Sequence, residues 1–407
     1  MTDRNWALLH RPFRIFWSGL VLSSLGTHVT MVAMAWQMYE ITDSPLQVGM
    51  LGLARAIPQT LTLLLGGLLA DALDRRRLLI VLQFGQCLVS AVLALLSSLE
   101  LATPVTLYVA TVFLALGAGL ENPARQSLVP VLVPRSMLTS ALAVNNSQQK
   151  LATILGPSLA GVILSVASPA WCYAIDACSW LAMLLSVWLV VPAAERGIAR
   201  GLVSFHALAE GLSYVWHDRV IATLLALDLI ANLFGTPRAL LPVYARDILS
   251  VGPAGLGLLY AAGATGSLLT ALVLSTFKRV GRPGLSVTLG LAVYGIGNIL
   301  FAVSTDFPLS LALLAMTGAG DTYSAIVRGT VNQLSVPDEL RGRVLSVSSM
   351  FTNSGPLLGQ FRAGLVAEAW TPVLAGVSGG IVVVAACALA ASSRAIRRYE
   401  VPNARVV

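Results

Sequence analysis

Residues 67–76 read Gly67-Leu68-Leu69-Ala70-Asp71-Ala72-Leu73-Asp74-Arg75-Arg76, and they join two long apolar stretches of the chain. The first stretch covers approximately residues 46–70 and the second approximately residues 78–98. Each is long enough to cross a bilayer as a helix, which takes about 20 apolar residues. The short charged loop between them therefore predicts two consecutive membrane-spanning helices that reverse direction at this 67–76 loop.

The same alternation of apolar stretch and short connection continues along the whole chain. Of the 407 residues, 56% are hydrophobic and only 11% are charged. Soluble globular proteins carry about 25% charged residues, so this composition excludes a water-soluble protein. We predict an all-α polytopic membrane protein with twelve transmembrane helices, at approximately residues 15–38, 46–70, 78–98, 104–124, 140–166, 171–192, 219–242, 254–277, 284–303, 308–327, 342–367 and 372–391.

Basic residues mark one side of these predicted spans. If Arg219 and Arg343, which lie within the first two residues of their spans, are counted with the preceding connections, 21 of the 26 lysines and arginines belong to one set of alternating segments, including a cluster of Arg328, Arg341 and Arg343, and the opposite set holds only Arg246. Cytoplasmic loops of membrane proteins are enriched in lysine and arginine. We therefore expect both termini in the cytoplasm and a location in the cell (inner) membrane, with the basic clusters orienting the chain rather than binding nucleic acid.

Several classes of chemistry are excluded or disfavoured by the sequence. The two lysines, Lys150 and Lys278, follow Gln149 and Phe277, so a phosphate-binding Gly-Lys-Ser/Thr loop for ATP hydrolysis is excluded. The four cysteines all lie inside apolar stretches and read as small buried side chains. His28 is the only histidine within a predicted span. We expect no metal and no cofactor, and a polytopic membrane enzyme is a remote alternative.

An internal repeat divides the chain into two halves. The pairs that match in the same order are Arg125 and Arg328, Pro134 and Pro337, Gly156-Pro157 and Gly355-Pro356, and the basic segments 74–77 and 278–282. Parallel repeats of this kind are typical of transporters whose halves rock about a central site. We predict two pseudo-symmetric six-helix bundles, residues 1–192 and 219–407, joined by a cytoplasmic linker at 193–218 that holds an amphipathic helix or is a plain tether.

The 67–76 loop resembles the signature loop of the major facilitator superfamily, Gly-x-x-x-Asp-Arg/Lys-x-Gly-Arg-Arg/Lys. Further similarity to the enterobactin-exporter and macrolide-efflux branch lies in the segments 39–45, 123–126, 210–215 and 336–343. The resemblance covers nearly the whole chain. It implies the major facilitator fold and transport by alternating access.

The resemblance also implies that the 67–76 loop closes the cytoplasmic side of the transporter. Asp71 can face the positive N-terminus of a helix, and Arg75 can pair with a carboxylate such as Glu121. Ala72 and Asp74 replace the basic residue and the glycine of the family pattern. The competing interpretation is that the arginines only orient the spans. The residues assigned to this gate are Gly67, Asp71, Asp74, Arg75, Arg76 and Glu121.

The fifth span resembles the antiporter motif of the superfamily. Proline bends a helix, and small residues let a neighbouring backbone approach. We expect the fifth span to pack on the eighth, through Gly255, Gly263, Gly266 and Ser267, although such kinks also occur in ordinary membrane helices. The residues assigned to this kink and its repeat are Gly156, Pro157, Gly161, Gly355, Pro356 and Gly359.

Polar residues inside the spans need a reason, because a charge at the bilayer centre costs about 3 kcal/mol or more. Drug–proton antiporters usually carry an arginine in the fourth span at the position of Phe113, so the usual coupling assignment does not transfer. Asp228 is the most central acid, about 13 Å from the start of its helix at 1.5 Å per residue. The alternative for each such residue is that it forms a structural ion pair or extends its charged head to the water. The residues assigned to a proton or substrate pathway are His28, Arg55, Asn145, Gln149, Asp228, Asp321 and Asn353.

Together these features favour a monomeric secondary active exporter of small amphipathic organic molecules, drug-like or siderophore-like, driven by proton antiport. The alternative within the same class is a proton-coupled or facilitative importer of a small polar nutrient. The sequence does not identify the substrate.

Overall fold

The computed structural model describes residues 6–72, 74–190, 212–213, 215–235, 237–276, 282–397 and 399. Within these ranges, the side chains of 63–72, 75, 127, 338–339 and 345–346 are outside the description. The predicted amphipathic helix in the 193–218 linker falls almost wholly on residues that are not described, so it stays a prediction.

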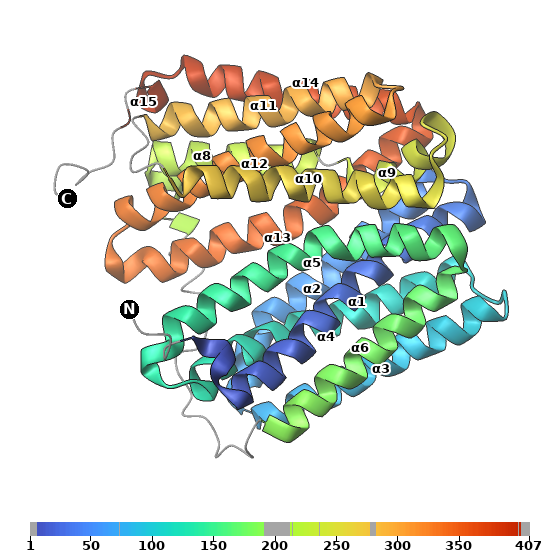
Figure 1. The fold of residues 1–407 in the computed structure, drawn as a ribbon. Coiled ribbons are helices and arrows are strands. Elements are labelled where there is room, and N and C mark those ends of the chain that lie inside the picture. Colours follow the sequence, from blue (N-terminus) through green and yellow to red (C-terminus); the bar gives the residue numbers. More distant parts are fainter. Residues whose placement is uncertain are drawn as a thin grey trace. The chain divides into compact units, whose positions relative to one another are not determined.

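The first half of the chain forms long helices, and turn residues set their ends. Asp74 caps α3, because its carboxylate accepts hydrogen bonds from the backbone N–H groups of Arg76 and Arg77. Thr103 begins α4 through a reciprocal capping box with Thr106. The helices are α1 (Arg11–Thr42), α2 (Pro45–Ala72), α3 (Arg75–Ser98), α4 (Pro104–Leu132), α5 (Leu138–Val166) and α6 (Pro169–Val190), with 3-10 turns η2 (Ala7–Leu9) and η3 (Arg135–Met137) (Figure 1).

The second half begins with a helix of 16 residues that is followed by short turns instead of continuing. Asp218 caps the start of α8 (Arg219–Phe234), and Gly235 ends it. Short turns follow, namely η4 (Arg238–Leu240), α9 (Leu241–Val243) and the π-helical η5 (Tyr244–Ile248). The remaining helices are α10 (Gly252–Leu274), α11 (Pro283–Val303), α12 (Phe307–Ser335), α13 (Asp338–Ala369), α14 (Pro372–Ser392) and α15 (Arg394–Arg397).

Many of these helices are suited to a bilayer. Among the described residues, nine helical segments are long and apolar enough to cross a membrane. The other three predicted spans lie in α2, α12 and α13, which are long helices outside that set, so the count of twelve stays a prediction. Large apolar side chains such as Val166 and Leu389 are exposed on the helices, as a lipid-facing surface requires.

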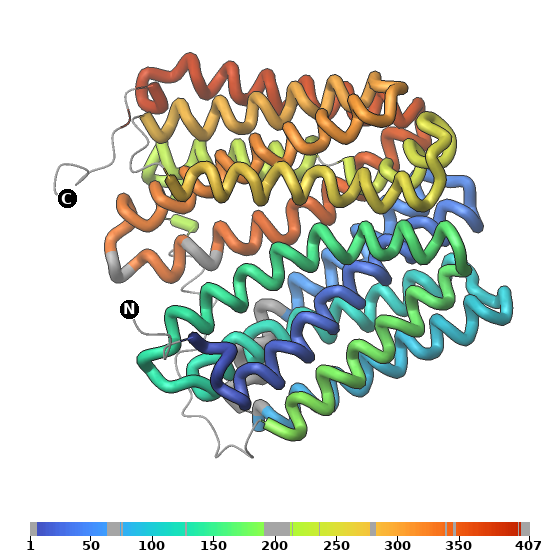
Figure 2. The backbone as a smooth tube through the Cα atoms, viewed as in Figure 1, coloured from blue at the N-terminus to red at the C-terminus, as the bar shows by residue number. Residues whose placement is uncertain are grey.

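Contacts divide the chain into two compact units. Unit 1 contains α1, α2 from Ala54 onward, α3 to α6, and Gly252–Leu258 at the start of α10 (Figure 2). Unit 2 contains Ser44–Leu53 at the start of α2, α8 and the rest of the chain from Leu259. The division into residues 1–192 and 219–407 that the sequence suggested stays a prediction.

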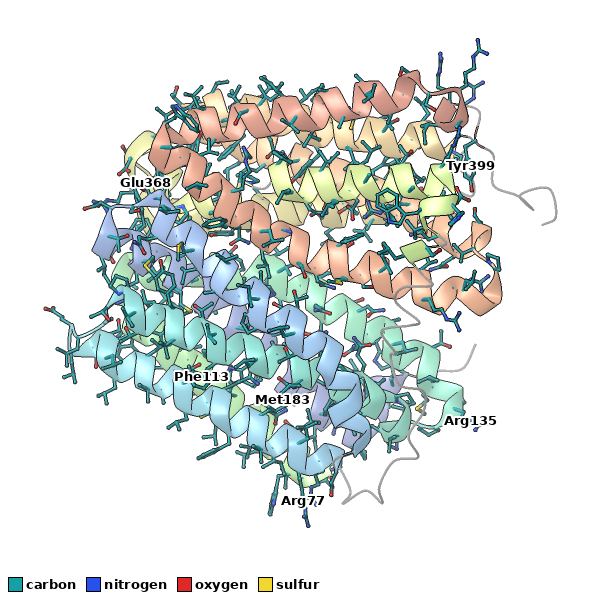
Figure 3. All side chains as sticks on the ribbon, turned by 180° about the vertical axis from the view of Figure 1, so that it is seen from behind. Arg77, Phe113, Arg135, Met183, Glu368 and Tyr399 are labelled. Atoms are coloured by element: carbon teal, nitrogen blue, oxygen red, sulfur yellow. The ribbon has the colours of Figure 1, made fainter. Side chains whose placement is uncertain are left out.

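Each unit has its own apolar core. In unit 1, Phe16 and Leu20 of α1 pack with Met183 and Val187 of α6 and with residues of α3 and α4 (Figure 3). In unit 2, one cluster joins α8, α11, α12 and α14, and its fully buried members include Leu224, Leu291 and Val331. These cores hold the polar groups described below in place.

Glycines allow two close helix crossings, one in each unit. A Cβ atom at Gly161 of α5 would lie 2.9 Å from the Cα atom of Gly257 in α10. A Cβ atom at Gly364 of α13 would lie 2.9 Å from the Cα atom of Gly49 in α2. The partner of α5 is thus the predicted helix, and the crossing lies at Gly257.

The other small residues predicted for that contact face a different helix. A Cβ atom at Gly266 would overlap the backbone of Ala315 in α12, and the Ser267 hydroxyl donates a hydrogen bond to the Gly318 carbonyl of α12 at 3.0 Å. The prediction that Gly263, Gly266 and Ser267 pack on α5 was wrong. The small residues of α10 do not all lie on one face of the helix, so they contact two different helices, α5 and α12.

Two helices are longer than the sequence indicated, and this moves two arginines. The helix α4 continues to Leu132 and α12 to Ser335. Arg125 and Arg328 therefore lie within helices. The prediction that Arg328 belongs to a cytoplasmic loop cluster was wrong, because its side chain is only 6% exposed.

Candidate functional site

The best-defined polar site lies in unit 2, around Asp228 of α8. The Asp228 side chain is 1% exposed, and its Oδ1 atom is 2.7 Å from Nη1 of Arg328 on α12. Among the described residues, Arg328 is the charged group recorded against this carboxylate. A buried pair of this kind joins two helices through complementary charge.

Neutral donors complete the surroundings of the Asp228 carboxylate. The Asn232 amide, one turn along α8, donates to Oδ1 at 2.9 Å, and the Thr352 hydroxyl of α13 donates to Oδ2 at 3.2 Å. Three helices, α8, α12 and α13, therefore meet at one carboxylate. We call Asp228, Arg328, Asn232 and Thr352 the Asp228 node.

The predicted kink residues of α13 explain how it reaches this node. A Cβ atom at Gly355 would lie 2.9 Å from the Cβ atom of Asn232, and one at Gly359 would lie 3.0 Å from the carbonyl oxygen of Leu233. Pro356 lies inside α13 between these glycines. The small residues therefore bring α13 against α8 next to the residue that supports Asp228.

The broken end of α8 is closed by side chains from two other helices. Arg362 of α13 donates to the Phe234 carbonyl at 2.8 Å and lies 5.2 Å from the centre of the Phe234 ring. The Tyr294 hydroxyl of α11 donates to the Gly235 carbonyl at 2.7 Å. A cation at the C-terminus of a helix is stabilised by the helix dipole. Arg362 thus has a structural environment rather than an ionic partner in the described contacts.

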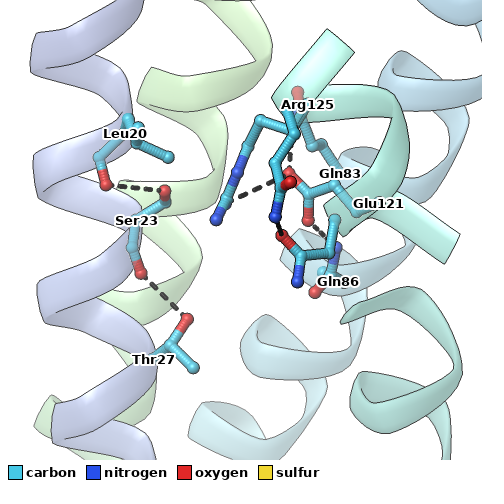
Figure 4. Close-up of polar contacts among 9 residues, drawn as sticks. Leu20, Ser23, Thr27, Gln83, Gln86, Glu121 and Arg125 are labelled. Atoms are coloured by element: carbon cyan, nitrogen blue, oxygen red, sulfur yellow. Dashed lines mark hydrogen bonds and ion pairs between the residues drawn. The ribbon is translucent and has the colours of Figure 1, made fainter. Parts of the chain in front are cut away.

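Unit 1 contains a second buried carboxylate, Glu121 of α4, which is 3% exposed (Figure 4). The amides of Gln83 and Gln86 on α3 each donate to it at 3.1 Å. Arg125, one turn along α4, places Nη1 3.7 Å from Oε1. Gly117 leaves room for Gln86, since a Cβ atom there would lie 2.9 Å from the Gln86 amide carbon. We call these four polar residues the Glu121 node.

The predicted gate at the 67–76 loop is described only in part. The surroundings of Gly67 and the side chains of Asp71 and Arg75 are outside the description, so the proposed pairing of Arg75 with Glu121 stays a prediction. Asp74 caps α3, which gives a physical reason for its replacing the glycine of the family pattern. Arg76 donates from Nη2 to the Trp188 carbonyl of α6 at 2.7 Å.

Two of the predicted pathway residues of unit 1, His28 and Arg55, have described neighbours on other turns and helices. A Cβ atom at Gly156 of α5 would overlap the His28 side chain of α1, so this glycine, which precedes Pro157, lets α5 pack against α1 at this histidine. Arg55 donates from Nε to Gln59 at 3.2 Å and from Nη1 to the Met31 sulfur at 2.7 Å.

The remaining predicted residues lie on partly open helix faces. Asn145 of α5 and Asp321 of α12 are half-buried, whereas Gln149 of α5 and Asn353 of α13 are exposed. The Asn353 amide donates to the Ser349 carbonyl of its own helix at 2.7 Å. Phe113 of α4 is also exposed.

Several polar residues of these nodes were missed by the sequence reasoning. Arg328 was assigned to a loop, and Gln83 and Gln86 were not singled out. Arg328 could have been found from its match to Arg125 in the internal repeat. A further buried acid is Asp176 of α6: the Ser90 hydroxyl of α3 donates to its Oδ2 atom at 2.7 Å, and the Ser179 hydroxyl lies 3.5 Å from its Oδ1 atom.

The Asp228 node can exist in two charge states. With Asp228 ionised, the pair with Arg328 is neutral overall and holds α8 to α12. If Asp228 takes up a proton, the guanidinium charge of Arg328 is left without its counter-ion. Within the described ranges no group of three or more His, Cys, Asp or Glu residues could hold a metal ion.

A family model described as "Transmembrane secretion effector" matches residues 4–406. The chain belongs to this family of the major facilitator superfamily. Two curated proteins are similar to this chain along most of their length. The multidrug efflux pump Tap of Mycolicibacterium fortuitum is 26% identical over 374 residues, covering 88% of this chain and 90% of Tap. The enterobactin exporter EntS of Salmonella choleraesuis is 25% identical over 393 residues, covering 94% of both chains.

Solved structures support the transporter fold. A bacterial homologue of the iron transporter ferroportin, in an inward-facing state, superposes with a TM-score of 0.72 at 18% identity, covering 94% of this chain and 99% of its own. A bacterial homologue of the lysosomal transporter Spinster gives a TM-score of 0.72 at 14% identity, covering 94% and 95%. The chain therefore has the fold of major facilitator transporters, and its homologues are transporters rather than enzymes.

Proposed function

We propose that this protein is a proton-driven exporter of small amphipathic organic molecules, and that Asp228 carries the coupling proton. The observation that carries the proposal is the buried Asp228–Arg328 pair at 2.7 Å, where α8, α12 and α13 meet. The similarity to an efflux pump and to an enterobactin exporter supports export over import.

The pair is suited to coupling because the attraction between Asp228 and Arg328 holds α8 to α12 only while Asp228 is ionised. On the outer side, where protons are more concentrated, Asp228 takes up a proton and its attraction to Arg328 is lost. On the inner side the proton leaves and the pair re-forms. Each elementary charge moved through 100 mV supplies about 2.3 kcal/mol, so one proton per cycle sustains a useful substrate gradient.

The wider arrangement belongs to the same proposal. Twelve spans form two six-helix bundles, both termini face the cytoplasm, and the protein works as a monomer in the inner membrane. The 67–76 loop closes the cytoplasmic side, so Asp71→Asn and Arg75→Ala should slow transport with little loss of equilibrium substrate binding. Normal transport in both variants would reduce this loop to an orientation signal.

Purified protein in liposomes tests the proposal. Ethidium and enterobactin serve as probes, and a gradient is imposed with an acidic lumen. An exporter that exchanges substrate for protons accumulates a probe in the acidic lumen, and an uncoupler abolishes the accumulation. A proton-coupled importer instead accumulates the probe when the outside is acidic, and a facilitator only equilibrates it.

A further inference from the structure

Two buried polar atoms without a hydrogen-bond partner flank Arg328 on α12. Ser324 is 0% exposed and Asn332 is 2% exposed. Within the described part of the chain, the Ser324 hydroxyl oxygen and the Asn332 amide oxygen have no partner. They lie four residues before and four residues after Arg328, on the same buried stripe of the helix. Such groups are rare in folded proteins and call for an explanation.

Helix geometry places both groups beside the arginine. Side chains four residues apart on an α-helix are neighbours, with Cβ atoms about 5–6 Å apart. Side chains also lean toward the N-terminus of their helix. Arg328 therefore leans toward the turn of Ser324, and Asn332 leans toward the turn of Arg328. Both oxygens can accept hydrogen bonds, and a guanidinium has five N–H donors.

We propose that Ser324 and Asn332 are the alternative acceptors of the Arg328 guanidinium when Asp228 is protonated. This inference rests on the proposed function, in which Asp228 takes up and releases a proton. Protonation removes the counter-ion of Arg328 within a buried site. The Ser324 and Asn332 oxygens then accept hydrogen bonds from the Arg328 guanidinium, which lowers the free energy of the state with protonated Asp228. Ser324 and Asn332 are positioning residues, because they act through Arg328.

Other titratable and charged groups lie on the helices around the node. On α12, Asp321 is half-buried two turns before Arg328, and Tyr323 packs against the apolar cluster of unit 2. On the neighbouring helices, the Tyr294 hydroxyl of α11 donates to the Gly235 carbonyl, and Arg362 of α13 donates to the Phe234 carbonyl. Cys387 of α14 is buried in the apolar cluster of unit 2.

Asn298 provides a matched control in the same unit. It lies on α11, is 2% exposed and also has an unpartnered amide oxygen. Its amide nitrogen donates to the Tyr294 carbonyl of its own helix at 3.0 Å. Asn332 and Asn298 thus share residue type, burial and an unpartnered oxygen, but only Asn332 neighbours Arg328 on α12.

Infrared titration of the purified full-length protein in lipid tests the inference without any substrate. The protonated-carboxyl band that disappears in Asp228→Asn belongs to Asp228. In Asn332→Leu its midpoint should move to lower pH by about one unit, a tenfold weaker proton affinity, the order expected for one lost hydrogen bond to a charged group. Ser324→Ala/Asn332→Leu should move it further. Asn332→Gln, which keeps the amide oxygen, and Asn298→Leu should leave it in place.

The outcomes separate this inference from the proposed function. An unchanged midpoint in the double variant, or an equal shift in Asn298→Leu, overturns the role of Ser324 and Asn332 while proton coupling through Asp228 stands. If Asp228→Asn removes no titrating band, both fail. Should the leucine variants not yield folded protein, Asn332→Ala and Asn298→Ala form the matched pair, with the same expected results.

Discussion

Arg125 and Arg328 occupy matching positions in the internal repeat, 203 residues apart, but they serve their carboxylates differently. In the Glu121 node the arginine belongs to the same helix as the acid, its Nη1 atom is 3.7 Å away, and its side chain is 20% exposed. In the Asp228 node the arginine comes from another helix, the distance is 2.7 Å, and its side chain is 6% exposed.

This difference separates a local contact from a contact that joins helices. Each acid also keeps two neutral donors, Gln83 and Gln86 for Glu121 and Asn232 and Thr352 for Asp228, so the difference lies in the arginines. Asp228 depends on Arg328 for its counter-charge, and the pair connects α8 with α12. We therefore expect the same repeat position to be structural in unit 1 and to serve proton coupling in unit 2.

The largest expected effect comes from removing each arginine. Arg328→Ala leaves a buried carboxylate without its counter-ion, and breaking such a pair costs about 3–5 kcal/mol. Arg125→Ala removes a longer, partly exposed contact, which should cost on the order of 1 kcal/mol. Heating the purified variants in detergent and measuring the remaining monodisperse protein compares them. Equal losses would remove the distinction between the two nodes.

Removing both charges should separate stability from transport. In Asp228→Asn/Arg328→Gln no unpaired charge remains, so the protein should be more stable than Arg328→Ala while uphill export stays lost. A double-mutant cycle should give an interaction energy of about 2 kcal/mol for this pair and well under 1 kcal/mol for Glu121 with Arg125. An equal interaction energy in both cycles would contradict the comparison.

The smallest expected effect concerns the neutral donors. Thr352→Val removes a donor that stabilises ionised Asp228, so protonation becomes easier and the pH of half-maximal export should rise by up to about one unit. Gln86→Leu removes a similar donor from Glu121 and should lower stability by about 1 kcal/mol without moving the pH profile. Export measured across a pH series checks both, and a shifted profile for Gln86→Leu would place Glu121 in the coupling pathway.

Sequence patterns predicted a large part of the fold. Apolar stretches bounded by charge, proline and glycine gave helices close to their observed ranges, because lipid requires long helices with internally satisfied backbones. The main errors were at the ends of α4 and α12, where Arg125 and Arg328 were taken as loop residues. A charge inside a helix is expected only when its partner is known, and that partner lies about 100 residues away for Arg328.

The site was predicted only as far as single residues allow. Asp228 was identified from its central position, and Gly355 from the repeat, but their meeting through Asn232 depends on how α13 crosses α8. Thr352 and the two glutamines of α3 resemble many other polar residues in the sequence. Their roles come from packing between distant helices, which no local pattern records.

Uphill export by Asp228→Asn in liposomes is the most direct test of the central claim, with Glu121→Gln as the matched control. Asparagine resembles the protonated acid but cannot release a proton. The account predicts that Asp228→Asn fails to accumulate ethidium or enterobactin in an acidic lumen, still exchanges the probe down its gradient, and that Glu121→Gln accumulates it. If Asp228→Asn accumulates the probe as the wild type does, Asp228 is a structural residue and Asp321 becomes the next candidate for the coupling acid.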